Sequence, residues 1–217
     1  MPGVEHLGLF VLAGLLLNLT PGPDVLFIVT HGLRHGTRCG MVAALGITAG
    51  CFVHIAAAAL GVGALLAASS TAFNLLKWAG AAYLLYMGWN LLRKPGDLPG
   101  LMASASAPVE LAPAAWAVFL RGFWTNVLNP KVALFFLAFV PQFIAPDAAQ
   151  PALLFLLLGL VFSVNGLFVN LGWAWAAATL ARHVKAVRHS LRWLDRAAGA
   201  LFIGFGLRLA LADNMSR

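Results

Sequence analysis

Long apolar stretches alternate with short polar or flexible segments along the whole chain. A membrane-spanning helix needs about 20 predominantly apolar residues. The pattern predicts six such spans, at residues 7–30, 40–68, 71–92, 114–144, 152–181 and 197–212. The sixth stretch is short, and we expect its helix to begin earlier, near Trp193, with Asp195 and Arg196 at headgroup level. Basic segments at 31–38 and 182–196 are expected to lie between spans.

Two of the six stretches are interrupted near their centres. Pro21 and Pro23 interrupt the first, and Pro130 interrupts the fourth. A proline removes a backbone donor and clashes with the preceding turn. In hydrocarbon the freed carbonyls must find partners, so such a break persists only where protein or a water-filled cavity surrounds it. We therefore expect protein or a water-filled cavity, and not lipid, to surround the two breaks.

Asp24 follows the first break directly. It is the only one of the seven acidic residues that falls well inside an expected span. An acid within the membrane is costly and is by default a candidate functional residue. The alternative interpretation is a proline kink with Asp24 placed near the membrane interface.

Composition supports a membrane protein. The chain has 217 residues, of which 61% are hydrophobic and 10% charged, and its mean hydropathy is +0.88. A soluble domain of this size could not bury so much apolar surface. We expect one transmembrane domain over residues 1–217. Glu5 stands where a signal peptide would carry basic residues, so the first span is expected to stay in the protein.

Charge predicts the orientation. The net charge of +7 comes from basic residues concentrated on one side of the predicted topology. Nine of them fall in the segments after spans one, three and five: Arg34, Arg38, Arg93, Lys94, Arg182, Lys185, Arg188, Arg192 and Arg196. The opposite side has Lys77, Arg208 and Arg217. The basic side should be cytoplasmic and both termini outside. This explanation is preferred to nucleic-acid or specific lipid binding because it accounts for all three segments.

The cysteines and histidines do not suggest a cofactor. Cys39 and Cys51 are 12 positions apart in one helical stretch, about 18 Å along the axis, which is too far for a disulfide. No C-x-x-C motif is present. His31 and His35 share a helix face, but two imidazoles without another close ligand make a poor metal site. We therefore expect neither a metal nor a cofactor.

The chain contains a candidate internal repeat. Residues 79–86, AGAAYLLY, align with residues 198–205, AGALFIGF, and the breaks of the first and fourth spans occupy matching places. Two homologous triplets of helices, at about 1–94 and 114–217 and joined by a flexible cytoplasmic linker at about 95–113, would enter the membrane from opposite sides. The predicted fold is an all-α membrane protein with six helices in an inverted 3+3 repeat, with helices one and four broken. The alternative is chance recurrence of small and aromatic residues.

Three motifs carry a family resemblance: NLTPGPD at 18–24, AAYLLYMG at 81–88 and NVLNPK at 126–131. They resemble the lysine-exporter (LysE) superfamily, in its homoserine/threonine-resistance (RhtB) branch. The resemblance covers nearly the whole chain. It implies export of an amino acid or close derivative across the bacterial cytoplasmic membrane, driven by the proton gradient.

Two other functions remain open alongside export. One is efflux of another small solute or a metal ion on the same scaffold. The other, more remote, is a membrane thiol reductase. The chain lacks the paired intramembrane cysteines and the dense His/Asp cluster of such relatives.

The candidate substrate and coupling residues are polar groups and prolines within the expected spans: Asn18, Pro21, Asp24, His54, Arg121, Asn126, Asn129, Pro130, Lys131 and Asn165. Asp24 would hold the ammonium of an amino acid or carry the coupling proton, and Lys131 or Arg121 would hold the carboxylate. Half-helix ends at the breaks supply further donors and carbonyls. Along straight helices Asp24 would lie about 9 Å and Lys131 about 25 Å from the inner surface. A direct contact is therefore expected only if the breaks shorten the path.

Several of these residues also have structural interpretations. Arg121 could extend to the interface instead of binding substrate. His54 is expected to be a hydrogen-bonded packing residue more than a proton relay. Asn165 and Asn170 are expected to bond neighbouring helices, with substrate contact as the less favoured alternative. Gly46 and Gly50 form a small-residue motif that could pack within the chain or between copies in a homo-oligomer, and packing within the chain is expected.

Overall fold

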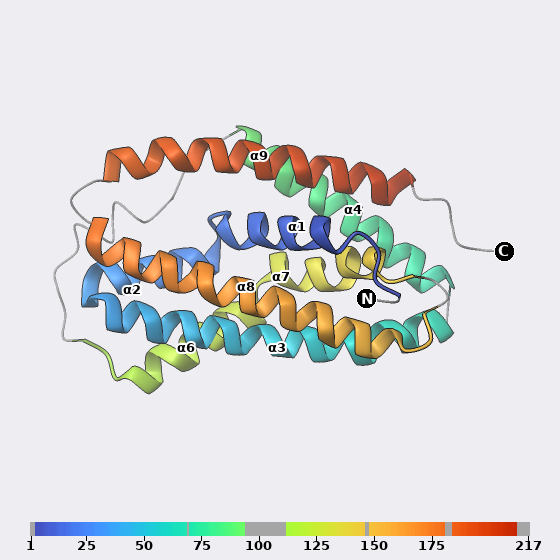
Figure 1. Cartoon of the computed structure of the whole chain (residues 1–217), viewed down its shortest axis with the longest axis horizontal. Helices are drawn as coiled ribbons and strands as arrows, with labels where there is room; N and C mark the ends of the chain where they lie inside the picture. Colours follow the sequence, from blue (N-terminus) through green and yellow to red (C-terminus); the bar gives the residue numbers. More distant parts are fainter. Residues whose placement is uncertain (1–2, 69, 94–111, 146–147, 181–183, 212–217) are drawn as a thin grey trace.

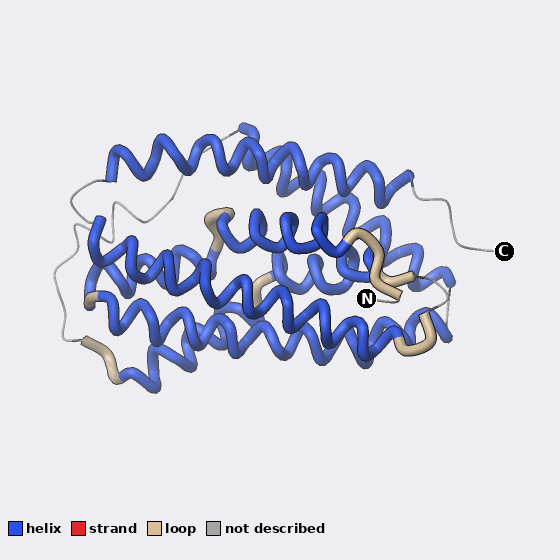
Figure 2. Tube along the Cα trace, in the orientation of Figure 1, coloured by secondary structure: helices blue, strands red, loops and turns tan. Residues whose placement is uncertain are grey.

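The structure, a computed structural model of the whole chain, describes residues 3–68, 70–93, 112–145, 148–180 and 184–211. These residues form a bundle of helices that run roughly along its long axis, with loops at its two ends (Figures 1 and 2). α1 begins and α9 ends at the same end of the bundle (Figure 1). Within the described ranges there is no strand, and one isolated antiparallel bridge joins Val4 to Ile144. The predicted all-α architecture is confirmed for this part of the chain.

Two helices are broken where the prolines predict. α1 (Leu7–Leu19) and α2 (Pro23–His35) meet at an angle of 51°. α6 (Ala115–Val127) and the following helical segment Pro130–Phe143 meet at 47°. Because Pro23 and Pro130 each occupy the first turn of the second half-helix, their missing N–H groups would be unbonded there anyway.

The segment after the second break changes its helix type. It consists of α7 (Pro130–Leu134), a π-helical turn η1 (Phe135–Phe139) and a 3₁₀ turn η2 (Val140–Phe143). Backbone bonds tie its end to the start of the chain, because Glu5 N donates to Phe143 O and Ala145 N to Gly3 O, both at 2.9 Å.

Four longer helices complete the described structure: α3 (Thr37–Ala68), α4 (Ser70–Arg93), α8 (Pro151–Leu180) and α9 (Val184–Leu211). α3 and α8 are long and apolar enough to cross a membrane, and the two bent pairs meet the same criterion when each pair counts as one span. The described residues thus contain two to four candidate spans by length and composition.

Two predicted basic loops are instead largely helical. α2 continues through His35 and α3 begins at Thr37, so only Gly36, with φ of 85°, separates them. α9 begins at Val184, well before the expected start near Trp193. Basic residues favour the last turn of a helix and have good helix propensity, so polarity alone did not mark a break here. The linker at 95–113, apart from its last two residues, and Pro146, Asp147 and Arg182 lie outside the described residues.

α3 is the central helix and packs closely against α6 and α8. A Cβ at Gly50 would lie 2.9 Å from Asn126 Cβ, and one at Gly122 would lie 2.9 Å from Ala43 O. Gly46 faces the carbonyl of Phe119 in the same crossing. These glycines let the backbones of α3 and α6 touch. The small-residue motif therefore packs within the chain.

An aromatic core holds the broken segments in place. Phe135, Phe136, Phe139 and Phe143 are all buried, and they pack with Phe10, Phe162, Phe202 and Phe205 from α1, α8 and α9. α4 and α9 cross along one side of the bundle (Figure 1). A Cβ at Gly88 would lie 2.7 Å from Gly199 O. The two segments of the candidate repeat, 79–86 and 198–205, thus lie on helices that contact each other.

Candidate functional site

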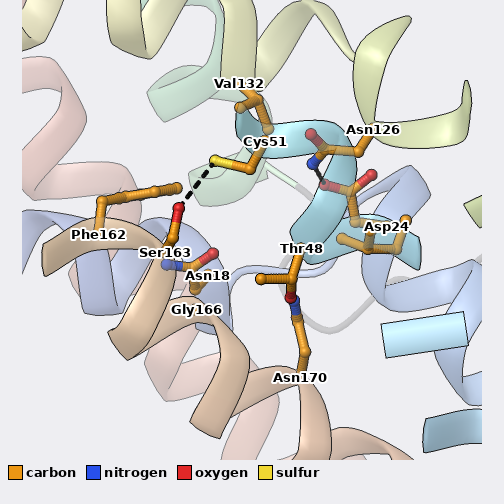
Figure 3. A pocket seen from close by; sticks show the side chains of 11 residues that line it. Asn18, Asp24, Thr48, Cys51, Asn126, Val132, Phe162, Ser163, Gly166 and Asn170 are labelled. Carbon is orange, nitrogen blue, oxygen red and sulfur yellow. Dashed lines mark hydrogen bonds between the residues drawn. The ribbon is translucent and has the colours of Figure 1, made fainter. Parts of the chain in front are cut away.

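A narrow cavity lies where the first break meets α3, α6 and α8 (Figure 3). Its interior has room for about one water molecule. The lining residues are mostly polar or small: Asn18, Asp24, Ile47, Thr48, Cys51, Asn126, Val132, Phe162, Ser163, Gly166 and Asn170. A polar cavity between broken helices is where a bundle of this kind can hold a small ligand.

Asp24 forms the acidic end of this cavity. It occupies the first turn of α2 because the proline break ends α1 just before it. Its Oδ2 accepts a 2.8 Å hydrogen bond from Asn126 Nδ2 on α6, while its Oδ1 is buried without a hydrogen-bond partner. The Asn129 side chain lies near enough to hydrogen-bond the carboxylate, and Lys131 lies near enough to interact with its charge. By the geometry of the bonds, however, Oδ1 itself stays unbonded, so the first break leaves one buried acceptor beside the cavity.

Asn126 supplies a second unbonded acceptor. Its Nδ2 donates to Asp24, and its Oδ1 is buried without a hydrogen-bond partner beside Gly50 of α3, where a Cβ would lie 3.3 Å from it. His54 on α3 fixes the position of Asn126, since His54 Nε2 lies 2.9 Å from the Asn126 carbonyl and must donate to it. The His54 ring also stacks on Phe136 at 6.5 Å. The expected role of His54 as a hydrogen-bonded packing residue is consistent with this arrangement.

The second break is closed by its own residues. Asn129 caps α7, because its Oδ1 accepts from Lys131 N at 3.0 Å. The Lys131 side chain extends to the first break, where Nζ donates to Thr20 O at 2.9 Å. A Cβ at Gly22 would lie 3.5 Å from this ammonium. Lys131 therefore reaches the Thr-Pro-Gly-Pro segment, because both spans bend at their breaks.

The end of the cavity away from Asp24 is polar but uncharged. Asn18 on α1, Thr48 and Cys51 on α3, and Ser163 and Asn170 on α8 line it (Figure 3). Ser163 Oγ donates to Cys51 Sγ at 3.6 Å across the α3–α8 contact. Gly166 leaves room for the Asn18 amide, since a Cβ there would lie 3.1 Å from Asn18 Oδ1.

The structure gathers some of the sequence-predicted residues and separates others. Asn18, Asp24 and Asn126 line the cavity, and His54, Asn129 and Lys131 contact the residues around it. Pro21 and Pro130 shape the two breaks. Arg121 is exposed on α6, and Asn165 is half-buried on α8; neither lines the cavity.

Four polar lining residues were not among the candidates: Thr48, Cys51, Ser163 and Asn170. The expected bonds from Asn165 and Asn170 to neighbouring helices are not observed, because neither side chain makes a hydrogen bond to another described residue. On α8, Ser163, Gly166 and Asn170 follow the i, i+3, i+7 spacing of one helix face, whereas Asn165 points elsewhere. That spacing was a signal in the sequence. Among the described residues, no group of three or more metal-ligating side chains occurs.

Comparison with known proteins identifies the scaffold. The sequence model of LysE type translocators matches residues 15–213, which is most of the chain. The chain belongs to the LysE type translocator family. It is therefore a translocator and not an enzyme. No solved structure matches the chain.

Individual relatives of this translocator carry two kinds of name. A homoserine/homoserine lactone efflux protein of Salmonella typhimurium is 34% identical over 94% of this chain and 96% of its own length. A leucine efflux protein of an Enterobacter species is 29% identical over 96% of both chains. An uncharacterized membrane protein of Vibrio cholerae is also 34% identical, over 94% of this chain and 95% of its own.

Proposed function

We propose that this translocator exports an amino acid or a close derivative across the bacterial cytoplasmic membrane in exchange for protons. Family membership supports an efflux role, and the names of the relatives make homoserine, its lactone and leucine the first solutes to test. The proposal rests above all on the carboxylate oxygen of Asp24 that has no hydrogen-bond partner, at a polar cavity between two broken spans.

The hydrogen-bonding capacity of the acidic end fits an ammonium group. The two atoms that lack a hydrogen-bond partner, Asp24 Oδ1 and Asn126 Oδ1, are both acceptors, and an ammonium is a donor only. A carboxylate that binds either a proton or an ammonium cannot hold both strongly. That exclusion is what coupled exchange of a proton for a substrate requires. The narrowness of the cavity fits a state of the transport cycle without bound substrate.

Replacing Asp24 with Asn tests this coupling. Asn keeps the size and one acceptor oxygen of the side chain but cannot titrate. Asp24→Asn should fold and insert, should abolish uptake of labelled homoserine or leucine driven by an imposed pH gradient in proteoliposomes, and should spare part of the substrate exchange at equal pH. Both modes are measured on the same vesicles.

The matched control is Glu5→Gln, which neutralises an exposed acid outside the cavity. It should behave as wild type in both modes. Full gradient-driven transport by Asp24→Asn would show that coupling does not use this carboxylate. If wild type moves no member of a full amino-acid panel, the proposed substrate class is wrong.

The proposed architecture is six spans in an inverted 3+3 repeat, with residues 1–94 and 114–217 as its halves. The matching breaks, the contact between α4 and α9, and the common end of α1 and α9 support it. The basic segments would face the cytoplasm and both termini the outside. A reporter active only outside the membrane should work when fused to the C-terminus; activity of a cytoplasm-dependent reporter there would reverse the orientation.

A further inference from the structure

Asn170 is a buried amide that the protein itself leaves unbonded. Its side chain lies on α8, is 5% exposed and lines the cavity on the same helix face as Ser163 and Gly166. It makes no hydrogen bond with any other described residue, and it points toward Thr48 in the cavity (Figure 3). Its amide atoms are not among the fully buried unbonded atoms, so they are reached from the cavity that Asn170 lines. An amide kept in this condition at a cavity wall points to a ligand that completes it.

Each of the other polar side chains Asn18, Thr48 and Ser163 at this end already donates a hydrogen bond within the protein. Asn18 Nδ2 donates to Gly14 O at 2.9 Å, and Thr48 Oγ1 donates to Ala44 O at 2.9 Å. Ser163 Oγ donates to Cys51 Sγ. At the acidic end, Asn126 Nδ2 donates to Asp24. Asn170 is thus the one lining amide, among the lining residues that the structure describes, with neither N–H engaged.

The two ends of the cavity therefore differ in what they offer. At the acidic end the buried acceptors Asp24 Oδ1 and Asn126 Oδ1 have no hydrogen-bond partner. The other end presents the two N–H groups of Asn170. The lining residues include no Lys, Arg or His. A ligand with a donor at one end and acceptor oxygens at the other would match this arrangement.

We propose that Asn170 binds the acyl oxygens of the exported solute while Asp24 and Asn126 bind its ammonium. This inference rests on the proposed function, because it assumes an amino compound as the cargo. Because the Asn170 amide is neutral, it donates hydrogen bonds to an acyl oxygen whether or not that oxygen carries a charge. Amino-acid esters and amides, which keep the carbonyl oxygen but lack the carboxylate charge, are therefore ligands as well.

Binding to the purified full-length protein in detergent tests the assignment, by ligand-induced thermal stabilisation at a series of concentrations. The probes are L-leucine and L-homoserine, each paired with its decarboxylated amine, 3-methylbutylamine and 3-aminopropan-1-ol, and leucinamide as the neutral acyl probe. Each is measured on wild type, Asn170→Leu and Asn170→Asp. The matched control is Asn90→Leu, which makes the same change at an exposed position on α4.

The expected result is a loss that depends on the acyl group. Asn170→Leu should weaken L-leucine, L-homoserine and leucinamide about ten- to hundred-fold, the range for losing hydrogen bonds to a charged or strongly polar group. It should leave each amine within about twofold. Asn170→Asp removes the donors and adds a negative charge, so it should weaken the amino acids further and leave the amines bound at least as well as in wild type. Asn90→Leu should match wild type throughout.

Three outcomes would overturn the assignment. Equal weakening of amino acids and amines in Asn170→Leu would make Asn170 a structural residue. Unchanged binding in both Asn170 variants would place it outside the site. Equal affinity of wild type for leucine and 3-methylbutylamine would show that the acyl end is not recognised, while amino-acid export itself could still stand. If wild type neither binds nor transports any of these solutes, the proposed function fails and this inference with it.

Discussion

The two broken spans share a proline at the start of their second half-helix, but they treat the break differently. Gly22, the residue before α2, has no side chain to cap the helix. Asn129, the residue before α7, caps it through Lys131 N. At the first break Asp24 lines the cavity, whereas after the second break Lys131 does not line it and bonds the Thr20 carbonyl instead. The same interruption of a helix therefore leaves an unbonded carboxylate oxygen in one span and a hydrogen bond between the two spans in the other.

The breaks are also joined to each other in a reciprocal way. Asn126, just before the second break, donates to Asp24, just after the first. Lys131, just after the second break, donates to Thr20, just before the first. Each span thus satisfies polar groups that the other has exposed. In hydrocarbon this mutual satisfaction is what allows both breaks to persist.

The largest effect on stability is expected from removing the hydrogen bond between Lys131 and the Thr20 carbonyl. Lys131→Met keeps the length of the side chain but loses the hydrogen bond to the Thr20 carbonyl. A hydrogen bond to a charged group contributes about 1.5–3 kcal/mol, so the free energy of unfolding should fall by about 2 kcal/mol. Denaturant unfolding of the purified protein in detergent micelles measures this.

Arg121→Met is the matched control for Lys131→Met, because Arg121 is an exposed cation in the same broken span. Its effect should stay within about 0.5 kcal/mol. Equal stabilities of the two variants would mean that the Lys131–Thr20 hydrogen bond does not stabilise the contact between the breaks. The difference drawn between the two breaks would then be wrong.

A smaller effect is expected from removing the cap of the second break. Asn129→Ala loses the acceptor for Lys131 N, and loss of such a cap costs about 1 kcal/mol of stability. Gly22→Ala, at the equivalent position of the first break, should cost less, because there is no side-chain hydrogen bond to lose and its Cβ would make an ordinary contact; the cost that remains is the preference of an N-cap for Gly over Ala. The same unfolding measurement compares them. Equal costs would show that the two helix starts do not differ.

The sequence indicated the breaks and the acid because prolines and a buried carboxylate are strong local signals. Pro21, Pro130 and Asp24 could be assigned without knowing any packing. The helix ends at His35 and Val184 could not, because basic residues extend a helix as readily as they form a loop. Counting residues along straight helices placed Lys131 far from Asp24. The two helices are bent at their breaks, so that estimate of depth does not apply.

The uncharged half of the cavity was harder to predict. Thr48 and Cys51 on α3 meet Ser163 and Asn170 on α8 only because of the register in which these helices pack. That register is set by close contacts such as Gly159, where a Cβ would lie 2.7 Å from Ile55. Periodicity within one helix identifies a face, but it does not tell which face of another helix lies opposite.

The glycine contact between α3 and α6 has a mechanical consequence. Helices that meet through side chains can slide past one another in small shear steps as rotamers change. At this crossing Gly46 and Gly50 lie directly against the carbonyls of Phe119 and Phe123, with no layer of side chains to rearrange. A slide of one residue would drive a neighbouring Cβ into a carbonyl. We therefore expect α3 and α6 to move together, and a motion that opens the cavity to occur at the proline breaks and at α8.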